Sequence, residues 1–357
     1  MVKTQKNFVI VALSGGVDSA IAAYLLKKAG HHVEAIFMKN WEADELCPAA
    51  EDFADAVKVC EKLKISLDLV NFSDQYWTNV FQFFLSEHQA GRTPNPDVLC
   101  NREIKFKAFL DQAKLRGADF IATGHYARRE DQDRQYELLK GVDLNKDQSY
   151  FLHRLNQAQI RHSLFPIGHL TKNQVRILAK DINLPNYAKK DSTGICFIGE
   201  RRSKSFLSHY LPDRPGSIET LLGEIIGRHD GLMFYTIGQR KGLQIGGISG
   251  KSEAPWYVVD KNLPRNALIV AQGNMHAALY RETLTVQDLH WINDQPKNVK
   301  LSAKIRYRQM DQLCRIQHLH DQTYHVIFDQ PQRAVTPGQS IVFYQHEKCL
   351  GGGMIVA

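Results

Sequence analysis

Apolar and polar positions follow two different patterns along the chain, and the first covers about 200 residues. Short continuous apolar runs alternate there with helical patterns, starting with the run at 8–13. A strand that is apolar on both faces is typical of a parallel sheet covered by helices on each side. We therefore predict an α/β domain whose ligands bind at the carboxyl ends of its strands. The predicted strands are 8–13, 33–38, 67–72 and 120–123, and the predicted helices are 19–29, 49–64, 74–90 and 101–116.

The pattern changes after the turn-rich stretch 211–216, where glycine becomes frequent and the helical period fades. From about residue 275 onward the chain reads as six short strands separated by tight turns, which predicts a small β-barrel. We thus expect an α/β domain at 1–210, a small mixed domain at 211–274 and a barrel at 275–357. The predicted barrel strands are 283–288, 299–308, 313–319, 323–329, 339–345 and 350–356.

Composition argues against membrane proteins, secreted proteins and small proteins stabilised by disulfides or zinc. No apolar run is long enough for a transmembrane helix, and the N-terminus lacks a signal-peptide pattern, so we expect a cytoplasmic protein without a membrane partner. Six cysteines without C-x-x-C pairs argue against a disulfide scaffold or a zinc ribbon, and we expect no protein-bound metal. The net charge of +7 permits a polyanionic partner but does not prove one.

The hexapeptide at 14–19 (Ser-Gly-Gly-Val-Asp-Ser) lies between the first strand and the first helix. Its glycines allow backbone N–H groups to approach an anion, and the helix N-terminus adds partial positive charge. We expect Ser19 to cap that helix. The loop is neither a Walker loop nor a dinucleotide fingerprint. A plain glycine turn explains a bare Ser-Gly-Gly equally well, but the whole hexapeptide in this context favours a phosphate site.

Two cysteines lie in segments rich in turn residues. Cys100 follows a proline-stiffened extended segment at 92–99, and we expect it where the helix 101–116 begins. A thiol near a helix N-terminus and several cationic side chains is expected to have a lowered pKa. The alternative is a small buried residue that covers a helix end. Cys196 lies in the second such segment, 191–198, and spacing alone does not show whether the two thiols meet.

The hexapeptide resembles the SGGxDS loop of the ATP pyrophosphatases (PP-loop enzymes), which cleave ATP between its α- and β-phosphates. Further motifs, in order and nearly end to end, resemble those of the tRNA-specific 2-thiouridylase family. These motifs are Pro-Asn-Pro-Asp at 94–97 with Cys100-Asn101, Thr-Gly-His-Tyr at 123–126, Lys-Asp-Gln-Ser-Tyr-Phe at 146–151, Ser-Thr-Gly-Ile-Cys-Phe at 192–197, Gly-Gln-Arg-Lys-Gly-Leu at 238–243, Arg-Tyr-Arg at 306–308 and Ala-Val-Thr-Pro-Gly-Gln at 334–339.

The resemblance implies ATP-dependent 2-thiolation of the wobble uridine (position 34) in tRNAs for lysine, glutamate and glutamine. Cys196 would carry the sulfur as a persulfide and attack the adenylated C2. Cys100 would either free sulfide or resolve the persulfide, forming a transient disulfide with Cys196. Asp97 would act as a general acid or base. The sulfur donor would be a relay protein or a cysteine desulfurase.

The resemblance also assigns binding residues. ATP, with Mg²⁺, would contact residues of the loop and two positions outside it: Ala12, Leu13, Ser14, Gly15, Gly16, Val17, Asp18, Ser19, Met38 and Gly124. The target base would contact Asn95, Pro96 and Asp97. The tRNA would contact His125, Lys146, Asp147, Gln148, Arg306, Tyr307 and Gln339.

The predicted strand 299–308 carries cations on alternate positions, among them Lys304, Arg306 and Arg308. On a regular strand these residues share one face and would form a stripe that follows RNA phosphates. Arg306 and Tyr307 would then lie on opposite faces, and both could contact RNA only at a strand end or bulge.

Two other functions fit the sequence less well. In an amide- or amidine-forming ligase of the same superfamily, Cys100 and Cys196 would have no role in the reaction. A non-catalytic RNA-binding protein with a degenerate nucleotide fold would not need a complete loop.

Overall fold

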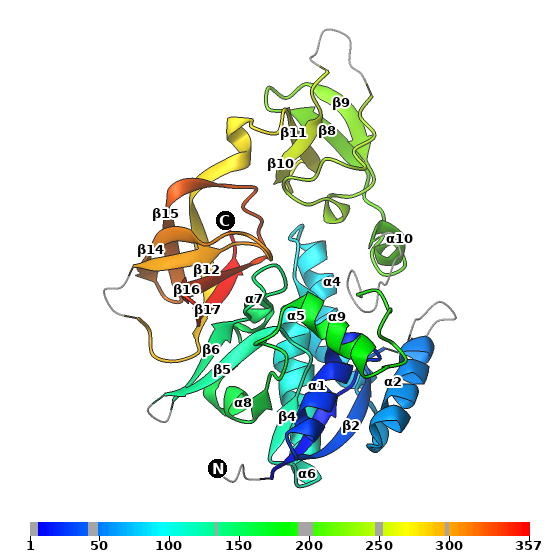
Figure 1. Ribbon diagram of the computed structural model, residues 1–357. Helices are drawn as coiled ribbons and strands as arrows, with labels where there is room; N and C mark the ends of the chain where they lie inside the picture. The colour runs from blue at the N-terminus through cyan, green and yellow to red at the C-terminus, as the bar shows by residue number, and fades with distance from the viewer. Residues whose placement is uncertain (1–5, 42–48, 133–134, 192–202, 247–252, 297–299) are drawn as a thin grey trace.

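The computed structural model describes residues 6–41, 49–132, 135–191, 203–246, 253–296 and 300–357, with side chains throughout except at 49 and 203. It consists of an α/β domain, a small central domain and a C-terminal barrel (Figure 1). This order agrees with the fold class predicted from the sequence. Within the described ranges, no helix combines the length and apolarity that a bilayer crossing requires.

A five-stranded parallel sheet forms the centre of the α/β domain, in the order β3-β2-β1-β4-β7. Alternate residues of β1 enter two separate cores: Val9 and Val11 pack with α1 and α2, whereas Ile10 and Ala12 pack with the helices on the other face. Both faces are therefore covered, which explains the continuous apolar run. The strands are β1 Phe8–Ala12, β2 His32–Lys39, β3 Leu67–Asn71, β4 Phe120–Ala122 and β7 Ser163–Leu164.

The four predicted helical regions are present, and the start of one of them differs clearly from the prediction. The helix expected at 101–116 begins earlier, at Pro96, because Asn95 accepts a hydrogen bond from the Asp97 amide (3.1 Å) and proline occupies the first helical position. The helices are α1 Val17–Lys28, α2 Ala49–Leu63, α3 Ser73–Tyr76, η1 Trp77–Phe81, α4 Gln82–Gln89, α5 Pro96–Leu99, η2 Cys100–Ala108, α6 Phe109–Leu115, α7 Ser149–Leu152, α8 Gln157–Arg161 and α9 Lys172–Asp181.

The central domain is a four-stranded sheet in the order β10-β11-β8-β9, around a core that includes Ile218, Val258 and Leu268. Its strands are β8 Gly216–Thr220, β9 Ile225–His229, β10 Trp256–Asn262 and β11 Ala267–Gln272. Its helical segments, with the one that leads into the barrel, are α10 Ser203–Leu207, η3 Leu232–Phe234 and η4 Ala277–Leu279.

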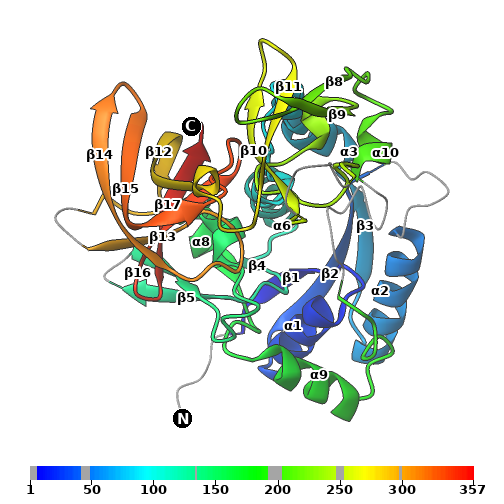
Figure 2. The ribbon, with the colours of Figure 1, turned by 90° about the horizontal axis from the view of Figure 1, so that it is seen from above.

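Six antiparallel strands form the barrel, which closes because β12 pairs with both β15 and β17. A hairpin of the α/β domain extends this sheet: β6 pairs with β17, so the two domains share one run of hydrogen-bonded strands (Figure 1). Figure 2 shows the same hairpin, labelled at β5, below the barrel strands. The strands are β5 Ala127–Gln132, β6 Gln135–Lys140, β12 Tyr280–Trp291, β13 Leu301–Lys304, β14 Gln312–His320, β15 Thr323–Arg333, β16 Ser340–Gln345 and β17 Lys348–Ile355.

Candidate active site at the phosphate loop

The phosphate loop turns sharply between β1 and α1. Gly15 has φ +75°, and a Cβ on it would lie 2.2 Å from the Asp52 carbonyl oxygen, so only glycine fits between the loop and α2. The N-cap of α1 is Gly16, which offers no side-chain hydrogen bond. The expectation that Ser19 caps this helix is therefore wrong. Ser19 lies inside the first turn, where its hydroxyl donates to the Gly16 carbonyl (3.1 Å).

This arrangement leaves the first amides of α1 without a side-chain cap, as a helix that binds an anion requires. Gly124, two residues after β4, packs against the same turn: a Cβ there would lie 2.6 Å from the Ser19 nitrogen. Ala12 and Leu13 are buried under the loop, and Met38 is half-buried at the carboxyl end of β2. The predicted nucleotide residues thus gather at one edge of the sheet, although their contact with ATP stays a prediction.

A chain of charges extends from the loop. Asp18 accepts hydrogen bonds from the Tyr126 hydroxyl (2.8 Å) and from the Lys172 ammonium (2.7 and 2.8 Å). Lys172 also contacts Asp191 (2.7 Å), which binds Lys146 (2.6 Å) on its other oxygen. Burial alone would raise the pKa of Asp191, but these hydrogen bonds lower it to about 2.

The helix that begins at Pro96 carries the other predicted site residues. Asp97 and Cys100 are one turn apart and so lie on the same face of the helix. Cys100 is 1% exposed and is the fifth residue after the N-cap Asn95, so it lies inside the helix rather than ahead of it. Burial raises the pKa of the Asp97 carboxyl, and the charge of Lys105 opposes this rise. Burial, with Lys105 adding to it, also lowers the pKa of His125 well below its usual value.

Lys105 therefore acts electrostatically on both Asp97 and His125, which places those two side chains around one cation. His125 is buried after β4, and its Nδ1 lies 2.8 Å from the Thr123 hydroxyl. The lowered pKa keeps this imidazole neutral at pH 7. Cys196 lies outside the described residues, and its segment follows directly after Asp191.

The turn at 146–148, predicted to contact tRNA, is tied into the protein. Asp147 is buried and accepts hydrogen bonds from the amides of Gly141 and Ser149 (both 3.1 Å). Gln148 accepts from the Tyr126 amide (2.9 Å), and Lys146 binds Asp191. The structure therefore gives each of these side chains an internal partner, and their contact with tRNA stays a prediction.

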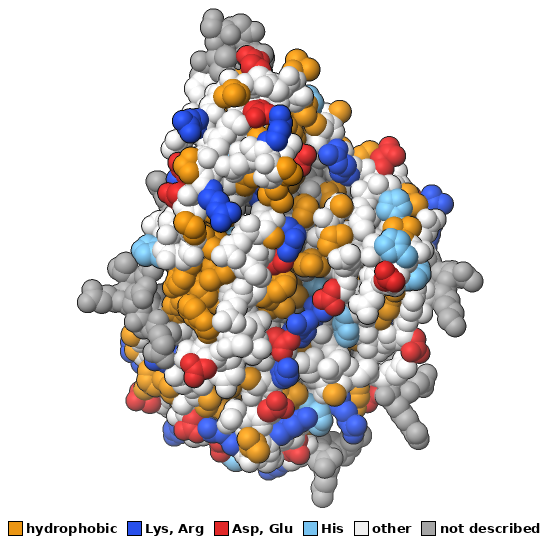
Figure 3. Space-filling model, turned by 180° about the vertical axis from the view of Figure 1, so that it is seen from behind, with side chains coloured by type: hydrophobic (Ala, Val, Ile, Leu, Met, Phe, Trp, Pro, Cys, Tyr) orange, Lys and Arg blue, Asp and Glu red, His pale blue; other side chains and the backbone are white. Residues whose placement is uncertain are grey.

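The predicted cation stripe on 299–308 is wrong. β13 ends at Lys304, and that side chain is buried 5.1 Å from the Tyr344 ring centroid and 3.6 Å from both Asp147 and Asp311. The alternation in the sequence gave no sign that the α/β domain covers this face. On the face seen in Figure 3, the described basic side chains are likewise interspersed with acidic ones.

Arg306 and Tyr307 lie beyond the end of β13, which is one of the two placements in which both could contact RNA. Tyr307 packs on Phe151 (ring centroids 4.6 Å apart). Burial raises the pKa of Tyr307. The charges of Lys146 and Asp147 change this pKa by smaller amounts, Lys146 lowering it and Asp147 raising it. Because such charges act over short distances, the barrel loop lies close to the 146–148 turn. Two parts of the predicted tRNA surface, far apart in sequence, are thus brought together.

Comparison with known proteins supplies the family. A family model for the tRNA methyl transferase HUP domain matches residues 7–200, one for the tRNA methyl transferase PRC-barrel domain matches 204–272, and one for the aminomethyltransferase beta-barrel domain matches 281–355. The tRNA-specific 2-thiouridylase MnmA of Stutzerimonas stutzeri is 57% identical over 98% of this chain and 95% of its own length. The chain belongs to the MnmA family.

Another MnmA, from Pasteurella multocida, is 56% identical over 99% of the chain and 94% of its own length. Among solved structures, the match to the U34-tRNA thiolase NcsA from Methanococcus maripaludis covers 57% of this chain and 64% of that protein, at 22% identity and a TM-score of 0.37.

For this MnmA-family chain, sequence reasoning missed three side chains around the loop. Lys172 and Asp191 form the charge chain, and Asn186 donates to the Gly15 carbonyl (2.9 Å). All three lie far from the loop in sequence. The sequence offered one weak sign of this: Lys172 lies in the first turn of a helix, where cations are disfavoured, so its presence there suggests another role.

Proposed function

We propose that this protein is a tRNA-uridine 2-sulfurtransferase that uses ATP to thiolate the wobble uridine of tRNAs for lysine, glutamate and glutamine. The observation that carries the proposal is the near full-length identity with tRNA-specific 2-thiouridylases, in a chain that keeps a complete phosphate loop and both predicted cysteines.

The loop suits the phosphates of ATP, because the uncapped amides of α1 and the adjoining Lys172 offer hydrogen bonds and positive charge. Within the described residues, no group of three or more His, Cys, Asp or Glu side chains could hold a metal ion. Mg²⁺ bound to the phosphates would neutralise charge on the departing pyrophosphate. Asp18, which accepts hydrogen bonds from Tyr126 and Lys172, is the carboxylate of the loop that would contact this ion.

In the first step, the C2 oxygen of the uridine attacks the α-phosphorus and pyrophosphate leaves. The C2=O bond becomes C2–O–P, so the ring nitrogen N3 must lose its proton. We propose that Asp97 accepts the proton from N3, because the raised pKa of its carboxyl suits a group that takes up a proton and later returns it. Asn95 and Pro96, at the start of the same helix, would contact the base, which must leave the anticodon stack to be reached.

In the second step, the terminal sulfur of a persulfide on Cys196 attacks C2, and AMP leaves with the former C2 oxygen. The Cys100 thiolate then attacks the inner sulfur of Cys196. The sulfur–sulfur bond breaks, its electron pair remains on the sulfur at C2, and N3 regains its proton. The products are 2-thiouridine and a Cys100–Cys196 disulfide, which a thiol reductant must reduce.

The alternative order gives the same products: Cys100 attacks first and releases hydrosulfide, which attacks C2. In both orders, a sulfur-relay protein or a cysteine desulfurase supplies the persulfide. His125, Lys146, Asp147, Gln148, Arg306, Tyr307 and Gln339 remain the proposed tRNA-facing set.

The test is to incubate the protein with ATP, Mg²⁺, a persulfide donor and unmodified tRNA, then digest the RNA for nucleoside mass spectrometry. We expect 2-thiouridine at position 34 and none with Cys196→Ser, which should still bind ATP and tRNA. Cys314→Ser, in the barrel core, is the matched control and should keep activity. Absence of thiouridine where the wild type binds both substrates would refute the proposal.

A further inference from the structure

Two segments that lie far from the phosphate loop in sequence contact its first glycine, Gly15. One is the first turn of α2, since a Cβ on Gly15 would overlap the Asp52 carbonyl oxygen. The other contains Asn186, whose side-chain amide donates a hydrogen bond to the Gly15 carbonyl (2.9 Å). The shape of the loop therefore depends on contacts outside the hexapeptide.

The hydrogen bond from Asn186 acts on the peptide group between two glycines. Gly15 has φ +75° and Gly16 has φ −84° with ψ 159°, and a glycine on each side leaves a peptide group unusually free to rotate. The carbonyl of Gly15 and the N–H of Gly16 belong to one planar trans peptide, so they point in opposite directions. By binding the carbonyl, Asn186 fixes the direction of the Gly16 N–H and turns it away from itself.

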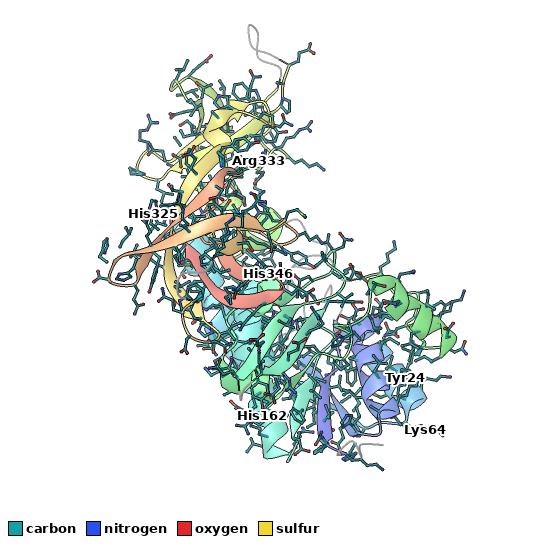
Figure 4. All side chains as sticks on the ribbon, turned by 60° about the vertical axis from the view of Figure 1, so that its left-hand side comes forward. Tyr24, Lys64, His162, His325, Arg333 and His346 are labelled. Carbon is teal, nitrogen blue, oxygen red and sulfur yellow. The ribbon has the colours of Figure 1, made fainter. Side chains whose placement is uncertain are left out.

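The turn that carries Asn186 is anchored to α9. Leu184 is buried in the core shared with α1, and its amide donates to the Ala179 carbonyl (2.9 Å). The Lys189 amide donates to the Asn186 carbonyl (3.0 Å), which closes the turn. The helix α9 lies beside α1, which is marked by Tyr24 in Figure 4. The side chain of Asn186 therefore starts from a fixed backbone.

Lys189 binds the other segment that contacts Gly15. Its ammonium donates to the carboxylates of Asp52 (2.7 Å) and Asp55 (2.5 Å), both of which belong to α2. The short stretch 186–189 thus contacts the loop through Asn186 and contacts the helix beside the loop through Lys189. Both contacts of Gly15 with distant segments therefore depend on this stretch.

One end of the Asn186 side chain is hydrogen-bonded and the other is not. The residue is 4% exposed, and its Oδ1 has no hydrogen-bond partner among the residues that the structure describes. A buried amide oxygen without a partner costs free energy, and an apolar side chain of the same shape, such as leucine, avoids that cost. What asparagine contributes at this position is therefore the donor directed at Gly15.

We infer that Asn186 is a positioning residue for nucleotide binding, which directs the Gly16 N–H toward the phosphates by holding the Gly15 carbonyl. A freely rotating peptide would have to be ordered when the anion binds, and this ordering would reduce affinity. Asn186 orders the peptide beforehand. The inference rests on the proposed function for the identity of the anion, which is ATP.

The test uses Asn186→Leu, which keeps the shape of the side chain but removes both the donor and the unpaired oxygen. We expect the Kd for ATP with Mg²⁺, measured by calorimetry, to rise about three- to tenfold, the effect of one hydrogen bond. The amides of 15–19 should exchange hydrogen faster, and the Kd for tRNA should change less than about twofold. The midpoint of thermal unfolding should move by less than about 3 °C, since the lost hydrogen bond is offset by the removal of a buried unpaired oxygen.

The matched control is Asn173→Leu, the same substitution at an exposed position of α9, which should bind ATP like the wild type. Asn186→Ala replaces Asn186→Leu in every comparison if the leucine variant does not fold. A lower unfolding midpoint with the Kd for ATP and the exchange at 15–19 unchanged would overturn the inference, because Asn186 would then be structural only. A wild type that binds ATP but forms no thiouridine would refute the proposed function and leave this comparison of ATP affinities valid.

Discussion

Replacing Asp191 by asparagine tests the charge chain that links the phosphate loop to the segment of Cys196. The substitution keeps the shape and one acceptor oxygen but removes the negative charge shared by Lys146, Lys172 and Arg176. We expect the free energy of unfolding to fall, because three cations lose the carboxylate that neutralises them.

The size of the loss follows from the pKa of Asp191, which is lowered from 3.8 to about 2. Each pKa unit corresponds to about 1.4 kcal/mol, so the folded state favours the ionised carboxyl by about 2 kcal/mol. The side chain is 29% exposed, and solvent screening makes this figure an upper bound. Because the folded pKa is depressed, the contribution is complete above pH 3.8 and is lost only as the pH falls toward 2.

Urea unfolding at pH 7 measures this loss directly. The matched control is Asp181→Asn, an exposed aspartate at the end of α9, which should change stability by less than about 0.5 kcal/mol. Combining Asp191→Asn with Lys172→Met should destabilise by less than the sum of the two single variants, because both remove the same ion pair. Full additivity, or an Asp191 effect no larger than the control, would refute the reasoning.

Three further results are expected. Gly124→Ala should weaken ATP binding at least tenfold by calorimetry, because its Cβ would lie 2.6 Å from the Ser19 nitrogen in the phosphate loop. Stability should fall as the pH drops from 7 to 5, by about 2 kcal/mol each for His88 and His153, since burial lowers their pKa values to about 4 and about 3; urea unfolding at both pH values checks this. Lys304→Met should destabilise by about 3 kcal/mol in urea unfolding, because two aspartates lose a buried cation, and a change below 1 kcal/mol would contradict that role.

Features that depend on neighbouring residues could be predicted from the sequence, and features that depend on contacts between distant segments could not. The strand and glycine turn around Gly15 were predictable, since an apolar run and two glycines act through neighbouring residues. The predicted start of the Asp97 helix was wrong. Asn95-Pro96 is a recognisable cap, but the two prolines of this stretch had been interpreted as part of an extended segment. The place of Lys304 could not be predicted, because alternation identifies two faces of a strand but not which one another domain covers.

The charge chain from Asp18 to Lys146 could not be predicted from the sequence for a related reason. Asp18 and Lys172 are separated by 154 positions and meet only because α9 packs beside α1. No periodicity in the sequence records that contact. The predicted meeting of Cys100 and Cys196 stays a prediction, since the segment 192–202 lies outside the described residues.

The pairing of β6 with β17 has a consequence for how the chain is made. The hairpin of the α/β domain emerges from the ribosome early, but its partner strand β17 follows only after the central domain and the strands β12 to β16. Until then β6 presents an unpaired edge, a hazard for strand-to-strand aggregation. The edge of this hairpin is therefore covered only once the barrel has been made, and deletion of Lys348 and Cys349, which pair with Leu139 and Leu138, would leave that edge open.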